Sequence, residues 1–186
     1  RLPQAITVRE RPPEADPTVE ARLAVSIEAA VDQALADLDA MRVREGAHLR
    51  TDLDGRQQAL AALIERLRFA AEEGRAELER RLRERVDEIA LELPVDQAMI
   101  AQEIVRAAQR SDISEEVTRF RAHLAHWAVL VEGDEPCGRK LDFLLQEMNR
   151  EINTIGSKAD GLGVSELIIN AKAEPERMRE QVQNVE

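Results

Sequence analysis

Apolar residues recur at intervals of three, four and seven along residues 49–93, and dense Arg and Glu fill the positions between them. This periodicity predicts a long coiled-coil-like helix. A helix with one apolar stripe cannot bury that stripe alone, so we expect an antiparallel partner helix or another subunit beside it. The stripe consists of Leu49, Leu53, Leu60, Ile64, Leu67, Ala71, Leu78, Leu82, Val86, Ile89 and Leu93.

Proline and capping residues divide the rest of the chain into a linker and shorter helices. Residues 1–17 contain four Pro and predict an extended linker, after which a helix begins near Thr18 as its N-cap. Gly46 either interrupts this helix or lies inside it. Pro94 marks a helix end, and Pro175 is expected to kink or split the last helix. Further helices are expected at about 96–110, 114–131 and 138–158, and from Val164 onward.

No strand pattern is visible, so we predict an all-α fold. It comprises a long antiparallel, coiled-coil-like helical hairpin and shorter packed helices. Three regions follow from this pattern. Residues 1–17 form the linker, residues 18–94 the long hairpin arm, and residues 95–186 a C-terminal helical domain that contains the helix at 138–158.

Composition narrows the possible functions. Aromatic residues make up only 2% of the chain, which argues against the base-stacking sheets of RRM or OB domains. A net charge of −11 excludes a strongly basic nucleic-acid-binding domain, so any such binding would depend on positioned groups or a metal. The single cysteine, Cys137, fits a reducing cytoplasm, and no segment is apolar and long enough to predict a membrane span.

The predicted helix at 138–158 has an unusual polar side. Its apolar positions lie on one side, and the opposite side combines Arg, amides and a hydroxyl. Arg and amide groups together can hold phosphates and sugars, but the same face could also pack on another subunit through hydrogen bonds. The apolar side is Leu141, Leu145, Met148, Ile152 and Ile155, the polar side is Arg139, Gln146, Arg150, Asn153 and Ser157, and between them runs a row of Lys140, Glu147, Glu151 and Lys158.

Carboxylates and one histidine supply candidate chemistry. Glu147 and Glu151 are four residues apart and are therefore neighbours on a helix, where they could hold Mg²⁺ or Mn²⁺ or pair with Arg of another helix. His123 shares a helix face with Glu116 and Asp112, so it could bind a metal or act in acid–base catalysis. An ordinary surface histidine is the alternative interpretation.

The run GRKLDFLLQEMNREINTIGSK, followed by the terminal MREQVQNVE, resembles the C-terminal signature of the YicC-like family of bacterial proteins. An upstream R-x-x-E-G-x-x-L pattern at Arg42, Glu45, Gly46 and Leu49 supports the resemblance, which covers the chain from about residue 20 to its end. Family members have an additional N-terminal region, so we expect this chain to be the C-terminal part of a longer protein.

The resemblance implies a cytoplasmic, metal-dependent endoribonuclease that forms a homo-oligomer, with a hexamer as the expected state and no membrane association. A non-catalytic RNA-binding adaptor that regulates RNA decay and a structural oligomerisation module are the alternatives. The implied roles are catalysis by His123, Glu147 and Glu151, binding of Mn²⁺ or Mg²⁺ by Asp142, Glu147 and Glu151, and RNA binding by Arg139, Lys140, Gln146, Arg150, Asn153 and Lys158.

Overall fold

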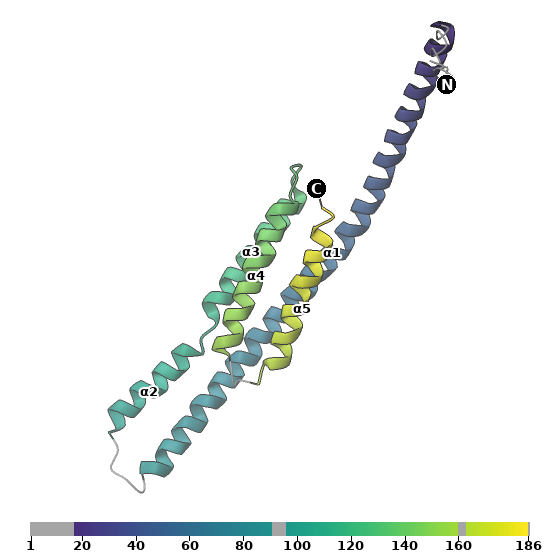
Figure 1. The fold of residues 1–186 in the computed structure, drawn as a ribbon. Coiled ribbons are helices and arrows are strands. Elements are labelled where there is room, and N and C mark those ends of the chain that lie inside the picture. The colour runs from purple at the N-terminus through teal and green to yellow at the C-terminus, as the bar shows by residue number, and fades with distance from the viewer. Residues whose placement is uncertain (1–16, 91–95, 160–162, 186) are drawn as a thin grey trace, which may run out of the picture. The chain divides into compact units, whose positions relative to one another are not determined.

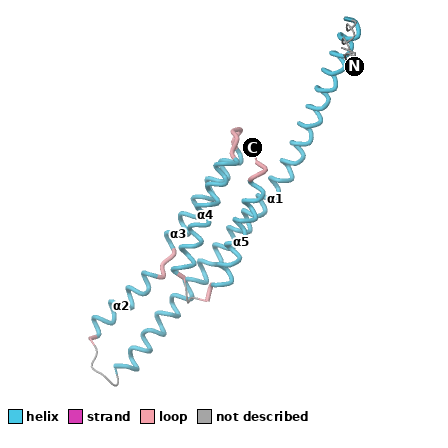
Figure 2. The backbone as a smooth tube through the Cα atoms, viewed as in Figure 1, coloured by secondary structure: helices cyan, strands magenta, loops and turns pink. Residues whose placement is uncertain are grey.

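The computed structural model describes residues 17–90, 96–159 and 163–185, and every regular element within these ranges is a helix (Figures 1 and 2). The all-α prediction is therefore confirmed. Residues 1–16 of the expected linker and Pro94 lie outside the described residues. The helices are α1 (Pro17–Ala90), α2 (Gln97–Arg110), α3 (Ser114–Glu132), α4 (Gly138–Lys158) and α5 (Ser165–Val182).

Helix α1 begins at Pro17, so Thr18 lies within its first turn and is not its N-cap. Proline is well suited to a first helical position, because the amide hydrogen it lacks would have no partner there. The helix continues through Gly46 without interruption. The sequence left open whether Gly46 interrupts the helix or lies inside it, and in the structure it lies inside.

The chain divides into two units, residues 1–47 and residues 48–186. In the described part of the first unit, the apolar stripe is exposed to solvent, and Leu23 and Ile27 retain 59% and 54% of their accessible surface. In the second unit, the same helix buries Leu60, Ile64 and Leu67 completely or nearly so. The apolar periodicity is similar in both stretches, but only the second has packing partners among the described residues.

The core of the second unit is a bundle formed by α1, α3, α4 and α5. Helix α3 runs antiparallel to α1, since Arg50 donates to the carbonyl oxygen of Val131 while Gln57 donates to that of Leu124. Phe120 and Trp127 of α3 are buried in this core. Helix α4 packs against both α3 and α5, which makes it the central element of the site described below.

Helix α2 lies against the last turns of α1, as the side-by-side ribbons in Figure 1 show. A hollow between them is lined by Arg83 and Val86 of α1 and by Ile100 and Ile104 of α2. Asp96 caps α2 by accepting hydrogen bonds from the backbone amides of Ala98 and Met99. The antiparallel hairpin and the shorter packed helices predicted from the sequence are both present.

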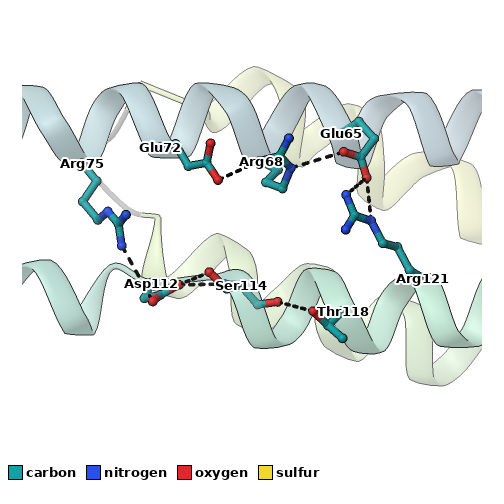
Figure 3. Close-up of polar contacts among 8 residues, drawn as sticks. All are labelled: Glu65, Arg68, Glu72, Arg75, Asp112, Ser114, Thr118 and Arg121. Atoms are coloured by element: carbon teal, nitrogen blue, oxygen red, sulfur yellow. Dashed lines mark hydrogen bonds and ion pairs between the residues drawn. The ribbon is translucent and has the colours of Figure 1, made fainter.

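Charged residues reinforce the packing of α1 on α3 (Figure 3). Arg121 of α3 donates two hydrogen bonds to Glu65 of α1, and Arg68 bridges Glu65 and Glu72. The Arg121 guanidinium lowers the pKa of the Glu65 carboxyl below its usual value. Arg75 approaches Asp112 at 3.7 Å, so the two helices are linked by charged groups over several turns.

Two positions fix how α4 and α5 meet. A Cβ added at Gly138 would lie 2.2 Å from the carbonyl oxygen of Val185, so only glycine permits this approach. Helix α5 runs through Pro175 and is not split there, which excludes one of the two outcomes expected from the sequence, and Pro175 itself is buried. The bundle packing on this proline offsets the hydrogen bond that it removes from the helix.

Candidate functional site

Helix α4 spans Gly138–Lys158, the range predicted from the sequence. Its predicted apolar side is buried in full, with Met148, Ile152 and Ile155 at 0% exposure. Each remaining side of the helix has a distinct environment. One side faces α3, one faces α5, and a third faces solvent.

The solvent-facing side is a continuous line of exposed side chains that we call the outer strip. Its members are spaced by four, three, four, three and four residues, which keeps them on one face of the helix. Gln146, Arg150, Asn153 and Ser157 also line a shallow hollow on this face, together with Asn149 and Thr154. The outer strip comprises Arg139, Phe143, Gln146, Arg150, Asn153 and Ser157, all of which are exposed.

The positive charges of the two Arg side chains in the outer strip are only weakly compensated by carboxylates. The Arg150 side chain is 75% exposed, and its closest carboxylate is Glu147 at 3.8 Å. Within the part of the chain that the structure describes, Arg139 makes no ion pair. Both guanidinium groups therefore have donors available for an anion from solution.

The side of α4 that faces α3 carries a row of charged residues that we call the α3 seam. Lys158 pairs with Glu116 at 2.7 Å, and Glu116 is only 3% exposed. Glu151 is 5% exposed, and Arg119 lies 3.8 Å from it. The α3 seam consists of Glu147, Glu151 and Lys158 on α4 and Glu116, Arg119 and His123 on α3.

The two ion pairs set the register between these helices. Glu116 is matched with Lys158 and Arg119 with Glu151, so α3 and α4 run antiparallel. His123 lies one turn beyond Arg119 on the same face of α3. From this register we infer that His123 is level with the turn of α4 that carries Glu147. The three residues predicted to be catalytic thus belong to one seam.

The carboxylates at the Lys158 end of the α3 seam, Glu116 and Asp112, have different hydrogen-bonding surroundings. One carboxylate oxygen of Glu116, Oε2, is buried and has no hydrogen-bond partner. Asp112, at the start of α3, accepts hydrogen bonds from the hydroxyl and the backbone amide of Ser114, which lower the pKa of its carboxyl. Arg75 and Lys158 lower the pKa of Asp112 further by charge attraction. Lys158 therefore acts on two carboxylates at this end of the seam.

The side of α4 that faces α5 holds Asp142. Its two carboxylate oxygens accept hydrogen bonds from Arg179 at 2.8 Å and from Gln146 at 2.7 Å. Asp142 lies nine residues before Glu151, which places the two on opposite sides of the helix. The predicted metal ligands Asp142, Glu147 and Glu151 are therefore not gathered at one point. Among the described residues, no group of three or more His, Cys, Asp or Glu could hold a metal ion.

The residues predicted to bind RNA fall into two groups. Arg139, Gln146, Arg150 and Asn153 lie together on the outer strip. Lys140 is paired with Glu135 at 2.9 Å and Lys158 with Glu116, so both lysine side chains already have carboxylate partners.

Phe143 was missed by the sequence-based search for polar residues, although it occupies the outer-strip position between Arg139 and Gln146. Its signal was the spacing itself, since positions 139, 143, 146 and 150 continue one line. The roles of all these residues are still predictions.

The described part of the chain is thus an all-α bundle whose central helix presents an exposed strip of Arg and amide side chains beside a row of buried ion pairs. The family model described as "Endoribonuclease YicC-like, C-terminal" matches residues 64–186. The chain belongs to this family.

Two curated relatives agree with the family match. The chain is 38% identical over 161 residues to "Probable endoribonuclease YicC" of Clostridioides difficile (strain 630), an alignment that covers 84% of this chain and 54% of the relative. It is 34% identical over 157 residues to the protein of the same name from Haemophilus influenzae (strain ATCC 51907 / DSM 11121 / KW20 / Rd), again over 84% and 54%. The chain thus spans about half the length of the curated relatives it matches. None of its described helices is long and apolar enough to cross a membrane.

Proposed function

We propose that this chain is part of an endoribonuclease that cleaves RNA phosphodiester bonds, with the outer strip and the α3 seam as its working surfaces. The observation that carries the proposal is the extent of the family match. Residues 64–186 include all of α3, α4 and α5, and both relatives bear the name of an endoribonuclease. The matched region therefore contains every residue of both surfaces.

The outer strip would hold the RNA. Guanidinium groups of Arg139 and Arg150 suit phosphate oxygens, and the amides of Gln146 and Asn153 suit sugar hydroxyls and base edges. Because the chain carries a net charge of −11, attraction of RNA depends on these positioned cations rather than on overall charge.

The α3 seam would supply the proton transfers. In phosphodiester cleavage, an attacking oxygen forms a bond to phosphorus and the bond between phosphorus and the leaving oxygen breaks. The proton of the attacking oxygen must pass to a base, and the leaving oxygen takes a proton from solvent water or from the base once that base has been protonated. His123 suits the first role, because an imidazole nitrogen can accept a proton from an attacking oxygen. Glu147, on the neighbouring turn of α4, would orient the imidazole.

Divalent-ion dependence is a separate part of the proposal. The acidic residues of a single chain do not fit one ion site, since Asp142 is held by Arg179 on the side away from Glu151. We therefore assign no step to a metal. Cleavage measured in EDTA and then with added Mn²⁺ or Mg²⁺ tests the dependence directly.

Assembly into a homo-oligomer, with a hexamer as the expected state, also belongs to the proposal. It is supported by the exposed apolar stripe of α1, which includes Leu23, Ile27 and Val31. Sedimentation velocity at several concentrations tests it, and a monomer throughout would contradict it. We also propose that the protein acts in the cytoplasm, because a single cysteine fits a reducing compartment.

The decisive experiment compares two histidines of the same helix. His123→Ala should slow cleavage of a labelled RNA by about a hundredfold or more, as expected for loss of a general base. RNA affinity should be unchanged. His126→Ala is the matched control, because His126 is exposed three residues away, and its cleavage rate should equal that of the wild type.

Two outcomes would favour the alternatives. If a highly purified protein that carries this chain at the full length of its relatives binds RNA but does not cleave it, the protein is a binding adaptor. If it neither binds nor cleaves RNA, the bundle is a structural module and the proposal fails.

A further inference from the structure

The chain has only four aromatic side chains, three Phe and one Trp, and all four lie in described helices. Phe120 and Trp127 are core residues, at 0% and 1% exposure. Phe69 is 56% exposed, but the guanidinium of Arg68 lies 4.0 Å from the centre of its ring. Phe143 is 60% exposed, and its ring makes no aromatic or cation contact within the described residues. Among the described aromatic side chains, Phe143 therefore has the exposed ring that no other aromatic or cationic group covers.

The position of Phe143 distinguishes it from an ordinary exposed apolar residue. Its neighbours Leu141, Leu144 and Leu145 all face the core, whereas Phe143 faces solvent. Leaving a Phe exposed forfeits about 2 kcal/mol of burial, yet a single exposed apolar residue is common and by itself indicates nothing. What matters here is that Phe143 interrupts an otherwise polar line of Arg and amide side chains.

The spacing along α4 places cations on both sides of the ring. With a rise of about 1.5 Å per residue, Arg139 is about 6 Å from Phe143 along the helix axis, and Arg150 is about 10 Å away in the other direction. Gln146, one turn on, is held by its hydrogen bond to Asp142. Long Arg side chains extending from both sides can reach phosphates that flank a base lying on the ring.

We propose that Phe143 is a base-stacking residue of the RNA-contacting surface, and that it makes the outer strip selective for single-stranded RNA. A nucleobase stacks on the exposed ring while Arg139 and Arg150 contact phosphates on either side of it. Bases of a duplex are stacked on one another and cannot reach such a ring, whereas unpaired bases can. This inference rests on the proposed function, because it takes the outer strip to be the RNA-binding surface.

Binding measured with matched strands tests the inference. The probe is a single-stranded RNA of about 12 nucleotides, the scale of a single-strand site, with one 2-aminopurine near its middle. Phe143→Ala should weaken binding by about tenfold and abolish the fluorescence quenching that stacking on the ring produces. Phe143→Trp should retain both. Gel electrophoresis after each titration checks that the strand is intact.

Two controls isolate the ring. Phe69→Ala removes a comparably exposed Phe of α1 and should leave affinity within about twofold of the wild type. A strand of the same length without bases keeps the phosphates but cannot stack, so the wild type and Phe143→Ala should bind it equally. Thermal unfolding of each variant confirms that the bundle is intact.

The possible failures can be told apart. If Phe143→Ala keeps full affinity and quenching while the double variant Arg139→Ala, Arg150→Ala binds poorly, stacking is wrong and the RNA-binding strip stands. If that double variant also binds normally, the strip is not the RNA surface and both proposals fail. If Phe143→Ala leaves RNA binding unchanged but shifts the sedimentation coefficient, Phe143 is a protein–protein contact and the inference is overturned.

Discussion

The α3 seam and the outer strip lie on the same helix, and both contain Arg or Lys close to polar or acidic side chains. In the α3 seam, Glu116 and Glu151 are almost completely buried, and each faces a cation of the opposite helix. On the outer strip, Arg150 is 75% exposed and its nearest carboxylate is 3.8 Å away. The difference shows that residue type alone does not assign a role. The buried charges of Glu116 and Glu151 are paired within the bundle, whereas an exposed charge such as that of Arg150 is available to a ligand.

The energetic consequence differs between the two surfaces. Removing one partner of a buried ion pair leaves a charge without water or a counter-ion, which is costly. Removing an exposed Arg loses little stability, because water replaces its contacts. Variants that break a buried ion pair of the α3 seam should therefore lower stability, whereas variants of the outer strip should lower RNA affinity alone.

Lys158→Ala should produce the largest effect. It leaves the buried carboxylate of Glu116 without its cation, and we expect unfolding to cost about 2 kcal/mol less, allowing for the partial exposure of Lys158. The melting temperature should fall by roughly 4–8 °C. Urea and thermal unfolding measure both quantities.

Lys140→Ala is the matched control for this prediction. Lys140 pairs with Glu135, whose side chain is 83% exposed, so its loss should leave the melting temperature and the urea midpoint unchanged within measurement error. Adding Glu116→Gln to Lys158→Ala should recover part of the loss by removing the uncompensated charge. Equal losses for the two lysine variants would mean that burial of the α3 seam has no energetic importance.

Sequence reasoning predicted α4 well because its information is local. The spacing of Leu141, Leu145, Met148, Ile152 and Ile155 fixed both the helix and its buried side, and the opposite polar residues are exposed as expected. Periodicity shows which side of a helix is apolar, and in α4 that side is the one buried in the core.

What the sequence could not supply was the identity of each neighbour. Asp142 and Glu151 appear equivalent as carboxylates, but one faces Arg179 of α5 and the other Arg119 of α3, which only the packing of the helices determines. Phe143 was overlooked because a Phe in an amphipathic helix is normally a core residue. The tolerance of α5 for Pro175 likewise depends on the packing that buries it.

Arg139→Ala combined with Arg150→Ala should give the intermediate effect. Affinity for single-stranded RNA should fall by about tenfold, since two phosphate contacts are lost. The slope of log affinity against log salt should become shallower by about 1.4, which is the value expected for two contacts on a single strand. The melting temperature should not change.

The control for this pair is Arg80→Ala combined with Arg83→Ala. These two Arg lie on the exposed part of α1 and pair with Glu of their own helix, so the variant has the same net charge without touching the strip. Its affinity and salt slope should match the wild type. A similar loss in both double variants would show that RNA responds to overall charge and not to the outer strip.

The smallest effect is expected at Asp112, which precedes α3 and is attracted by Lys158 at one end of the α3 seam. Asp112→Ala removes the acceptor for the Ser114 amide at the start of α3 and should cost about 1 kcal/mol, whereas Asp112→Asn should cost less because its side-chain oxygen can still accept.

Folding lowers the pKa of the Asp112 carboxyl, so its charge stabilises the fold above the unfolded pKa, about 4, and that contribution is lost as the pH falls further. Urea unfolding of the wild type and Asp112→Asn at about pH 7, 5 and 3.5 measures the difference. The wild-type advantage should be constant at the two higher values and shrink at the lowest. An advantage that does not change with pH would mean that the Asp112 charge, and with it the attraction of Arg75 and Lys158, adds nothing to the seam.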